Sequence, residues 1–266
     1  MPLPTTNLTL HLDASDTDTL FTTWADGGSH TGTPADGNAV QAWSRETDGS
    51  VNPAHATDGS ARYPAYRSST PLMLLPCLDF DGSDDQLQVV NDTNQTTYVG
   101  TSSFLGGQAK TILIAFYAES ITDTAIGSHG LIGGDSSFGL CLRDVSGTKK
   151  VGAINNGGSD AVELTVSTAT THVACMRQDT SNIYLSVDGG AESSTASTFS
   201  SADSKITIAR CFGSTVYNGR IGEIALYNAA LTGSDLTDAI AYFRLKWQGV
   251  GGGSNSTSRR MLLGIG

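Results

Sequence analysis

The chain has 266 residues, a net charge of -11, 38% hydrophobic residues and 15% charged residues. Nucleic-acid binders neutralise phosphates with a basic stripe, which this chain lacks, so we expect no nucleic-acid partner. No apolar run reaches the roughly 20 residues that a membrane-spanning helix needs, so we expect no membrane partner. The 31 glycines and the low charge indicate a β protein rich in turns.

The N-terminus and the cysteines indicate where the protein is made. Residues 1–16 contain neither a basic stretch nor a long apolar stretch, so we expect no signal peptide and synthesis in a reducing cytosol. Cys77, Cys141, Cys175 and Cys211 are far apart and lack the CxxC spacing of zinc sites. We therefore expect four buried free thiols rather than a disulfide.

Predicted strands follow one another along most of the chain. The first is Leu8–Leu12, and a loop-rich segment at 22–76 follows, which we interpret as surface packed against the rest. Thr111–Ala118 is apolar on both faces and is predicted to be a central strand. The other predicted strands are Leu78–Phe80, Gln86–Val90, Phe138–Arg143, Val151–Ile154, His172–Arg177, Asn182–Val187, Lys205–Arg210 and Ile221–Tyr227. Strands without alternating helices favour an antiparallel sandwich.

One turn and one helix have clear local signals. Asp188-Gly189 follows a strand pattern and predicts a tight hairpin turn. Thr232 is predicted to be the N-cap of a C-terminal helix, with Asp235 in the capping-box position, and the helix is predicted to end before Gly249. Its apolar stripe consists of Leu236, Ala239, Ile240, Phe243 and Trp247. We expect this stripe to lie on the sandwich.

The last residues differ in composition from the rest. We divide the chain into a sandwich at 1–249, a flexible linker at 250–258 and a C-terminal peptide at 259–266. The peptide contains two basic and four large apolar residues: Arg259, Arg260, Met261, Leu262, Leu263 and Ile265. A frayed tail is one interpretation. We favour docking onto a partner chain, with the arginines binding acidic groups and the apolar side chains filling a groove.

Four blocks, in this order, resemble the laminin-G-like and concanavalin-A-like lectin sandwiches, especially their bacterial and phage members. They are Leu10–Phe21, Leu78–Val89 (LDFDGSDDQLQV), Thr171–Gly189 and Arg220–Trp247, and together they span about residues 8 to 248. The resemblance implies an all-β fold, a two-sheet antiparallel jelly-roll sandwich with one C-terminal amphipathic helix. Such domains often bind glycans or proteins, and the fold also hosts hydrolases.

The chain lacks the carboxylate pair of hydrolases with this fold. Their acid and nucleophile lie on one strand in patterns such as E-x-D-x-E. Here Glu223 is followed by Ala225 and Tyr227, so we expect no glycosidase and assign Glu223 a structural or surface role. Spacing alone leaves Ser-His-Asp or Cys-His catalysis open, although no GxSxG elbow occurs.

An acidic segment offers a weak metal-site candidate. Asp79, Asp81, Asp84 and Asp85 surround Gly82, and calcium prefers several oxygen ligands from such a loop. The alternative is a turn in which aspartates accept hydrogen bonds from local backbone N–H groups. We favour the turn, and we keep Asp81, Asp84 and Asp85 as the calcium candidates.

Aromatic residues in loops are candidates for sugar stacking. They are Trp24, Trp43, Tyr63, Tyr66, Tyr98 and Tyr217. We expect most of them to belong to the core.

The resemblance and the tail together lead to a functional hypothesis. We interpret the chain as a non-enzymatic phage virion protein, either a capsid decoration or a head or tail appendage. It would be a homo-oligomer or present in several copies on a particle, anchored to other virion proteins through the C-terminal peptide and able to bind host-surface glycans. A free carbohydrate-binding module is the alternative, and a divergent glycoside hydrolase or lyase is less favoured.

Overall fold

The computed structural model describes residues 2–25, 29–44, 54–55, 62–68, 73, 75–89, 109–134, 138–198, 205–211 and 216–249. The predicted linker and C-terminal peptide, residues 250–266, lie outside these residues, as does Tyr98. The roles predicted for them therefore stay predictions. Among the described residues, no helix has the length and apolar character needed to cross a membrane.

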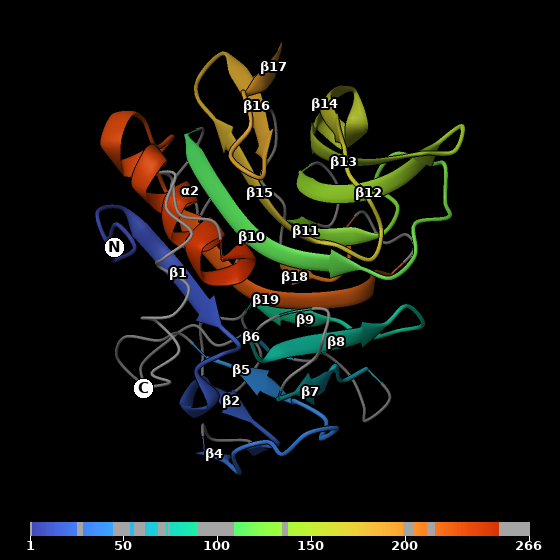
Figure 1. Ribbon diagram of the computed structural model, residues 1–266, viewed down its shortest axis with the longest axis vertical. Coiled ribbons are helices and arrows are strands. Elements are labelled where there is room, and N and C mark those ends of the chain that lie inside the picture. The colour runs from blue at the N-terminus through green and yellow to red at the C-terminus, as the bar shows by residue number, and fades with distance from the viewer. Residues whose placement is uncertain are drawn as a thin grey trace.

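Two antiparallel sheets pack face to face (Figure 1). Along the eight-stranded sheet the order is β17 (Ser193–Ala196), β16 (Asn182–Val187), β15 (Thr171–Gln178), β10 (Lys110–Ala118), β19 (Asn218–Tyr227), β8 (Cys77–Asp81) and β7 (Ala65–Arg67). β1 (Leu8–Asp13) also pairs with β19. Along the nine-stranded sheet the order is β14 (Asp160–Thr165), β13 (Thr148–Asn155), β12 (Gly139–Val145), β11 (Gly130–Gly134), β18 (Ile206–Ile208), β9 (Leu87–Val89), β6 (Ala54–His55), β5 (Ala42–Trp43) and β2 (Leu20–Phe21). The predicted two-sheet sandwich is confirmed.

The central strand β10 is apolar on both faces, as predicted. Ile112, Ile114 and Phe116 point into the main core between the two sheets. Leu113 and Tyr117 point outward into a second core. Successive side chains of a strand alternate between its faces, so only a strand covered on both sides has this composition.

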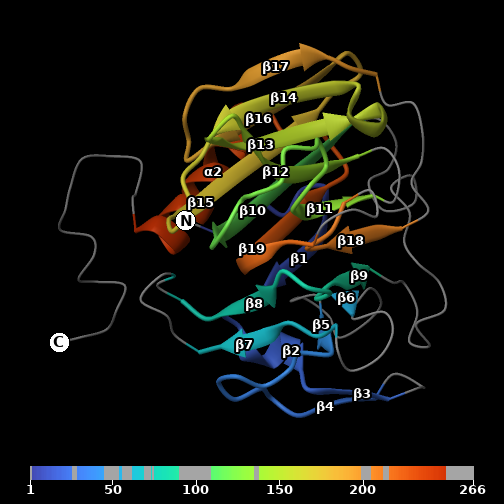
Figure 2. The same ribbon diagram turned by 90° about the vertical axis from the view of Figure 1, so that its right-hand side faces the viewer.

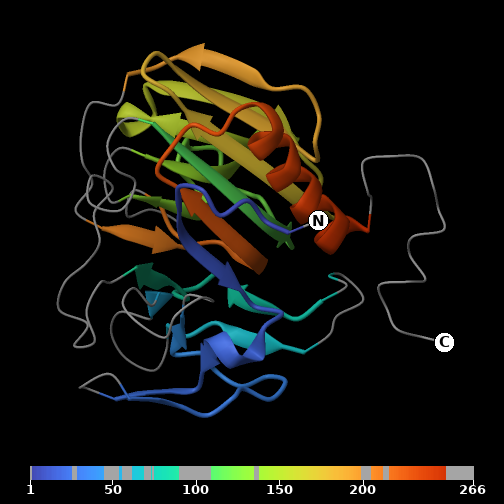
Figure 3. The same ribbon diagram turned by 90° about the vertical axis from the view of Figure 1, so that its left-hand side faces the viewer.

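The second core lies beneath helix α2 (Gly233–Gln248), which covers the outer face of the eight-stranded sheet (Figure 3). Ala239, Phe243 and Trp247 are its buried residues, in agreement with the predicted stripe. The helix ends where predicted, at Gly249, whose φ of 66° is left-handed and whose N–H donates to the carbonyl of Arg244.

The predicted capping box is wrong. Thr232 is the N-cap residue, but its side chain makes no capping hydrogen bond. The next residue, Gly233, has a left-handed φ of 59°. The chain therefore enters the helix by a path that does not place the Thr232 hydroxyl over the N–H groups of the first turn.

The segment at 22–76 is part of the sandwich rather than only its surface. It contributes β5 and β6 to the nine-stranded sheet and β7 to the eight-stranded sheet. It also forms a hairpin of β3 (Thr23–Ala25) and β4 (Ser29–Thr31). Figure 2 shows this hairpin at one end of the molecule and β17 at the other.

The four cysteines are free and buried, as predicted. Burial raises the pKa of the Cys77, Cys141 and Cys175 thiols to about 12. These thiols therefore stay protonated at neutral pH and act as small apolar side chains, because only a thiolate is a good nucleophile or metal ligand.

Candidate functional site

Residues 81–85, which we call the acidic turn, connect the two sheets, because β8 belongs to one sheet and β9 to the other. The Ser83 N–H donates to Asp81 Oδ1 at 2.7 Å, which closes the turn locally. Gly82 has a φ of 77°, and a Cβ there would lie 2.7 Å from Asn218 Cβ. The turn thus needs glycine for its conformation and for its close contact with β19.

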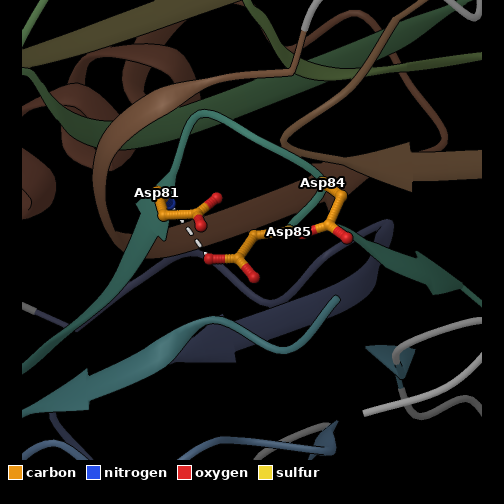
Figure 4. Close-up of side chains that lie close together, drawn as sticks. All are labelled: Asp81, Asp84 and Asp85. Atoms are coloured by element: carbon orange, nitrogen blue, oxygen red, sulfur yellow. Dashed lines mark hydrogen bonds between the residues drawn. The ribbon is translucent and has the colours of Figure 1, made fainter. Parts of the chain in front are cut away.

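The three predicted metal-ligand candidates come together at this turn. Asp81, Asp84 and Asp85 each offer a carboxylate oxygen, and these oxygens lie within 4.8 Å of one another. Asp81 is exposed, whereas Asp85 is only 5% exposed. Figure 4 shows the Asp81 N–H donating to Asp85 Oδ2, at 3.0 Å. The capping role that the sequence favoured is therefore present, together with a convergence of three acids.

The pKa of Asp85 is raised to about 7. Burial is the main cause, and the carboxylates of Asp81, Asp84 and Asp79 add to it, while the Asp81 N–H acts in the opposite direction. In the unfolded chain an aspartate has a pKa near 3.8. The folded state therefore loses stability relative to the unfolded state as the pH rises from about 4 to about 7, because over this range the unfolded chain releases the proton that the buried carboxyl keeps. A bound cation would remove this penalty.

The donor set of the acidic turn fits a hard cation. Three carboxylates supply oxygen ligands only, as calcium prefers, and calcium binds six to eight oxygens. Water or the hydroxyls of a ligand would supply the remaining positions. Asp79, which the sequence placed in the same group, instead binds Arg67 at 2.8 Å and Arg220 at 3.3 Å.

Most of the aromatic candidates belong to the core, as expected. Trp43, Tyr66 and Tyr217 are buried there. Tyr63 is half-buried, and the carbonyl of the preceding residue, Arg62, accepts the Gln86 N–H at 3.1 Å. The Tyr63 ring packs against the main core between the sheets, and its chain segment lies beside Gln86, the residue that follows the acidic turn. The side chain of Trp24 is outside the described residues, as is Tyr98.

Glu223 has the structural role that the sequence favoured. It is fully buried beneath α2 and accepts hydrogen bonds from His11 Nε2 at 2.6 Å and from the indole N–H of Trp247. Lys246 Nζ lies 3.0 Å from its second oxygen. Burial raises the pKa of Glu223, but these donors outweigh burial and leave the pKa below its usual value.

Sequence reasoning missed a second carboxylate beside Glu223. Asp13 of β1 is its direct partner in the β1–β19 ladder. Burial and the Glu223 charge raise the pKa of Asp13, while an ion pair with Lys246 lowers it. The two acids are only 5% and 0% exposed, so this pair is shielded from solvent. A period-two pattern within one strand could not reveal a partner from another strand.

Comparison with known proteins identifies the fold. No protein-family model and no curated protein sequence matches the chain. Domain 4 of a GH43 extracellular arabinanase from Geobacillus stearothermophilus, in complex with arabinotriose, matches with a TM-score of 0.53 at 14% identity. The match covers 88% of this chain and 98% of that domain.

Two further solved structures match over 90% of this chain. They are the Trypanosoma rangeli sialidase in complex with sialic acid, with a TM-score of 0.56 at 14% identity, and the binding domain of Paraclostridial mosquitocidal protein 1, with a TM-score of 0.53 at 10% identity. The chain spans 33% of the sialidase and 52% of the toxin domain. At these identities the matches show a shared lectin-like β fold and nothing more about activity.

Proposed function

We propose that this chain is a glycan-binding module that does not cleave glycosidic bonds, and that the acidic turn with Tyr63 is its sugar site. One observation carries the proposal: three carboxylates converge at the turn that joins the two sheets, and the backbone of Arg62, beside Tyr63, bonds to Gln86 directly after that turn. Sugar hydroxyls bind carboxylates directly or through calcium, and sugar rings stack on aromatic faces.

The structural matches support this proposal. The arabinanase domain was solved with arabinotriose and the sialidase with sialic acid. Because almost the whole arabinanase domain is covered, this chain has the dimensions of one such module. The proposed absence of glycosidase activity is supported by the burial of Asp13 and Glu223. These two carboxylates are cross-strand partners, and both are buried, so a polysaccharide would not reach them.

We expect the wild-type protein to bind members of a glycan array more strongly in 5 mM calcium than in EDTA. Asp84→Asn and Tyr63→Ala should each weaken that binding at least tenfold, because they remove a ligand oxygen and the stacking ring.

Calcium should also raise the melting temperature by about 3–8 °C at pH 8. The rise should shrink at pH 5, where Asp85 keeps its proton and no longer offers calcium an ionised oxygen.

Asp18→Asn serves as the matched control, since Asp18 is exposed in a different turn. It should bind glycans like the wild type. Equal calcium responses in Asp84→Asn and the wild type would refute the metal component. Glycan binding that survives both site substitutions would refute the sugar site. Release of sugars from a polysaccharide panel would refute the proposed absence of glycosidase activity.

The assignment to a phage virion is a second proposal, which rests on the composition of residues 250–266. A basic pair followed by an apolar peptide after a Gly-Ser linker is suited to anchoring a multicopy decoration on other virion proteins. Deletion of residues 250–266 should abolish incorporation into particles and leave the melting temperature of the sandwich unchanged. Full incorporation of the truncated chain would contradict this proposal.

A further inference from the structure

Three residues at one end of β15 have the geometry of a serine–histidine–acid triad. The Ser167 hydroxyl oxygen lies 3.2 Å from His172 Nε2. On the other side of the ring, His172 Nδ1 lies 2.7 Å from Asp188 Oδ2. The hydroxyl, the imidazole and the carboxylate therefore form one continuous hydrogen-bonded chain, in the order that nucleophilic serine catalysis requires.

The hydrogen bonds around the imidazole determine its tautomer. Nε2 lies 3.2 Å from the backbone N–H of Ser167 and 3.1 Å from the Ser167 carbonyl oxygen, so its own contacts allow either tautomer. The 2.7 Å contact of Nδ1 with Asp188 Oδ2 places the proton of the neutral ring on Nδ1 and leaves the lone pair on Nε2. Asp188 accepts that proton, and its ionised form is favoured: burial acts against the charge, but hydrogen bonds from His172, Val173 and Gln248 outweigh burial and lower its pKa. Nε2 is thus available to act as a base toward the Ser167 hydroxyl.

The triad combines a rigid base with an accessible nucleophile. His172 is buried, with Phe116 packed at a ring-centroid distance of 5.7 Å, whereas Ser167 is exposed. Ala169, in the same loop, has a left-handed φ of 58°, a strained conformation for a residue with a Cβ. Within the described part of the chain, the backbone N–H of Thr168 donates no hydrogen bond. The N–H after the nucleophile is a usual oxyanion donor.

We propose that Ser167, His172 and Asp188 form an acyl-transfer site that accepts small carboxylic esters at the protein surface. Its role is distinct from the proposed sugar site, because it lies on the β15 and β16 strands and their loops rather than at the acidic turn. The sequence around Ser167 contains no GxSxG elbow and no other local motif that would predict this site. Only the fold brings the exposed serine to the base.

The reaction needs water as its only co-reactant. Ser167 Oγ attacks the ester carbonyl carbon while its proton passes to His172 Nε2. The tetrahedral intermediate collapses, the bond to the alcohol oxygen breaks, and the imidazolium returns the proton to the leaving alkoxide. A water molecule then attacks the acyl-serine by the same route, which releases the carboxylic acid and restores the hydroxyl.

The test uses the full chain with a fluorophosphonate probe, in which the serine oxygen displaces fluoride, and with p-nitrophenyl acetate. We expect labelling to map to Ser167 by mass spectrometry. Ser167→Ala should abolish labelling, and Asp188→Asn should slow both reactions by on the order of 100-fold or more, because the tautomer is then lost.

Ser194→Ala is the matched control, because Ser194 is an exposed serine on the neighbouring strand β17, and it should label like the wild type. The melting temperature of each variant separates loss of reactivity from loss of folding. If His172 has only a structural role in this loop, Ser167→Ala will hydrolyse the ester at the wild-type rate. The probe will then show no preference for labelling Ser167. Either result overturns the proposal and leaves the proposed glycan site untouched.

Discussion

Replacement of Glu223 with alanine is expected to lower the free energy of unfolding by about 3–5 kcal/mol. The carboxylate is fully buried and holds His11 of β1 together with Lys246 and Trp247 of α2. Without it, His11, Trp247 and the Lys246 charge lose a buried acceptor. Urea unfolding followed by tryptophan fluorescence at pH 7 measures the loss.

The pH dependence gives this prediction a second readout. The folded-state pKa of Glu223 is below its ordinary value of 4.5. Its stabilisation is therefore complete above about pH 4.5 and disappears as the pH falls through the lowered folded value. Glu223→Ala should lose little additional stability in acid, unlike the wild type. Glu119→Ala is the control, because its side chain is 42% exposed and its ion pair with Arg220 is worth at most about 1 kcal/mol. Equal losses for the two variants would contradict the role of the buried network.

Replacement of Gly222 with alanine is expected to destabilise the protein by about 3 kcal/mol, although it adds only one methyl group. A Cβ at this position would lie 2.3 Å from Cη2 and 2.4 Å from Cζ3 of Trp247. The indole is a rigid ring whose N–H is bonded to Glu223, so it cannot move aside without releasing that bond. Helix α2 must shift outward or the strand must bend.

Gly152→Ala, on the opposite sheet, is the control. It tests whether the loss of stability comes from the contact with Trp247 or from any replacement of a strand glycine by alanine. Its Cβ would lie 3.4 Å from the flexible Glu163 side chain, so we expect a change within about 1 kcal/mol. Trp247→Leu should make Gly222→Ala far less harmful, because the two positions are in contact and their effects are not additive. Additive losses in the double variant, measured by urea unfolding, would refute the steric explanation.

The elements found from the sequence are those with strong local signals. β10, β15, β16 and the end of α2 lie within about one residue of their predicted positions, because alternation and a C-terminal glycine are properties of neighbouring residues. β11 was missed because its composition, GLIGG, is atypical of strands. Its glycines reflect a distant contact: a Cβ at Gly133 would lie 2.5 Å from Cys211 Sγ. No local pattern contains that information.

The candidate sites divide in the same way. The acidic turn was visible because its three aspartates all lie within residues 81–85, and a short turn must bring such residues together. The Asp13–Glu223 pair was not visible, since 209 intervening residues separate its members and only the β1–β19 register aligns them. The Ser167–His172–Asp188 chain also needs the pairing of β15 with β16, which brings Asp188 back to His172.

The sequence by itself determined the antiparallel sandwich, its closing helix, the free thiols and the position of the acidic turn. Each depends on periodicity or on spacing within a few residues, where backbone geometry leaves little choice. The tertiary structure alone decided which polar groups meet and which of them reach solvent. Glu223 is buried beneath helix α2, whereas Ser167 is exposed. Burial and long-range register depend on the whole chain, and they set the chemistry of each group.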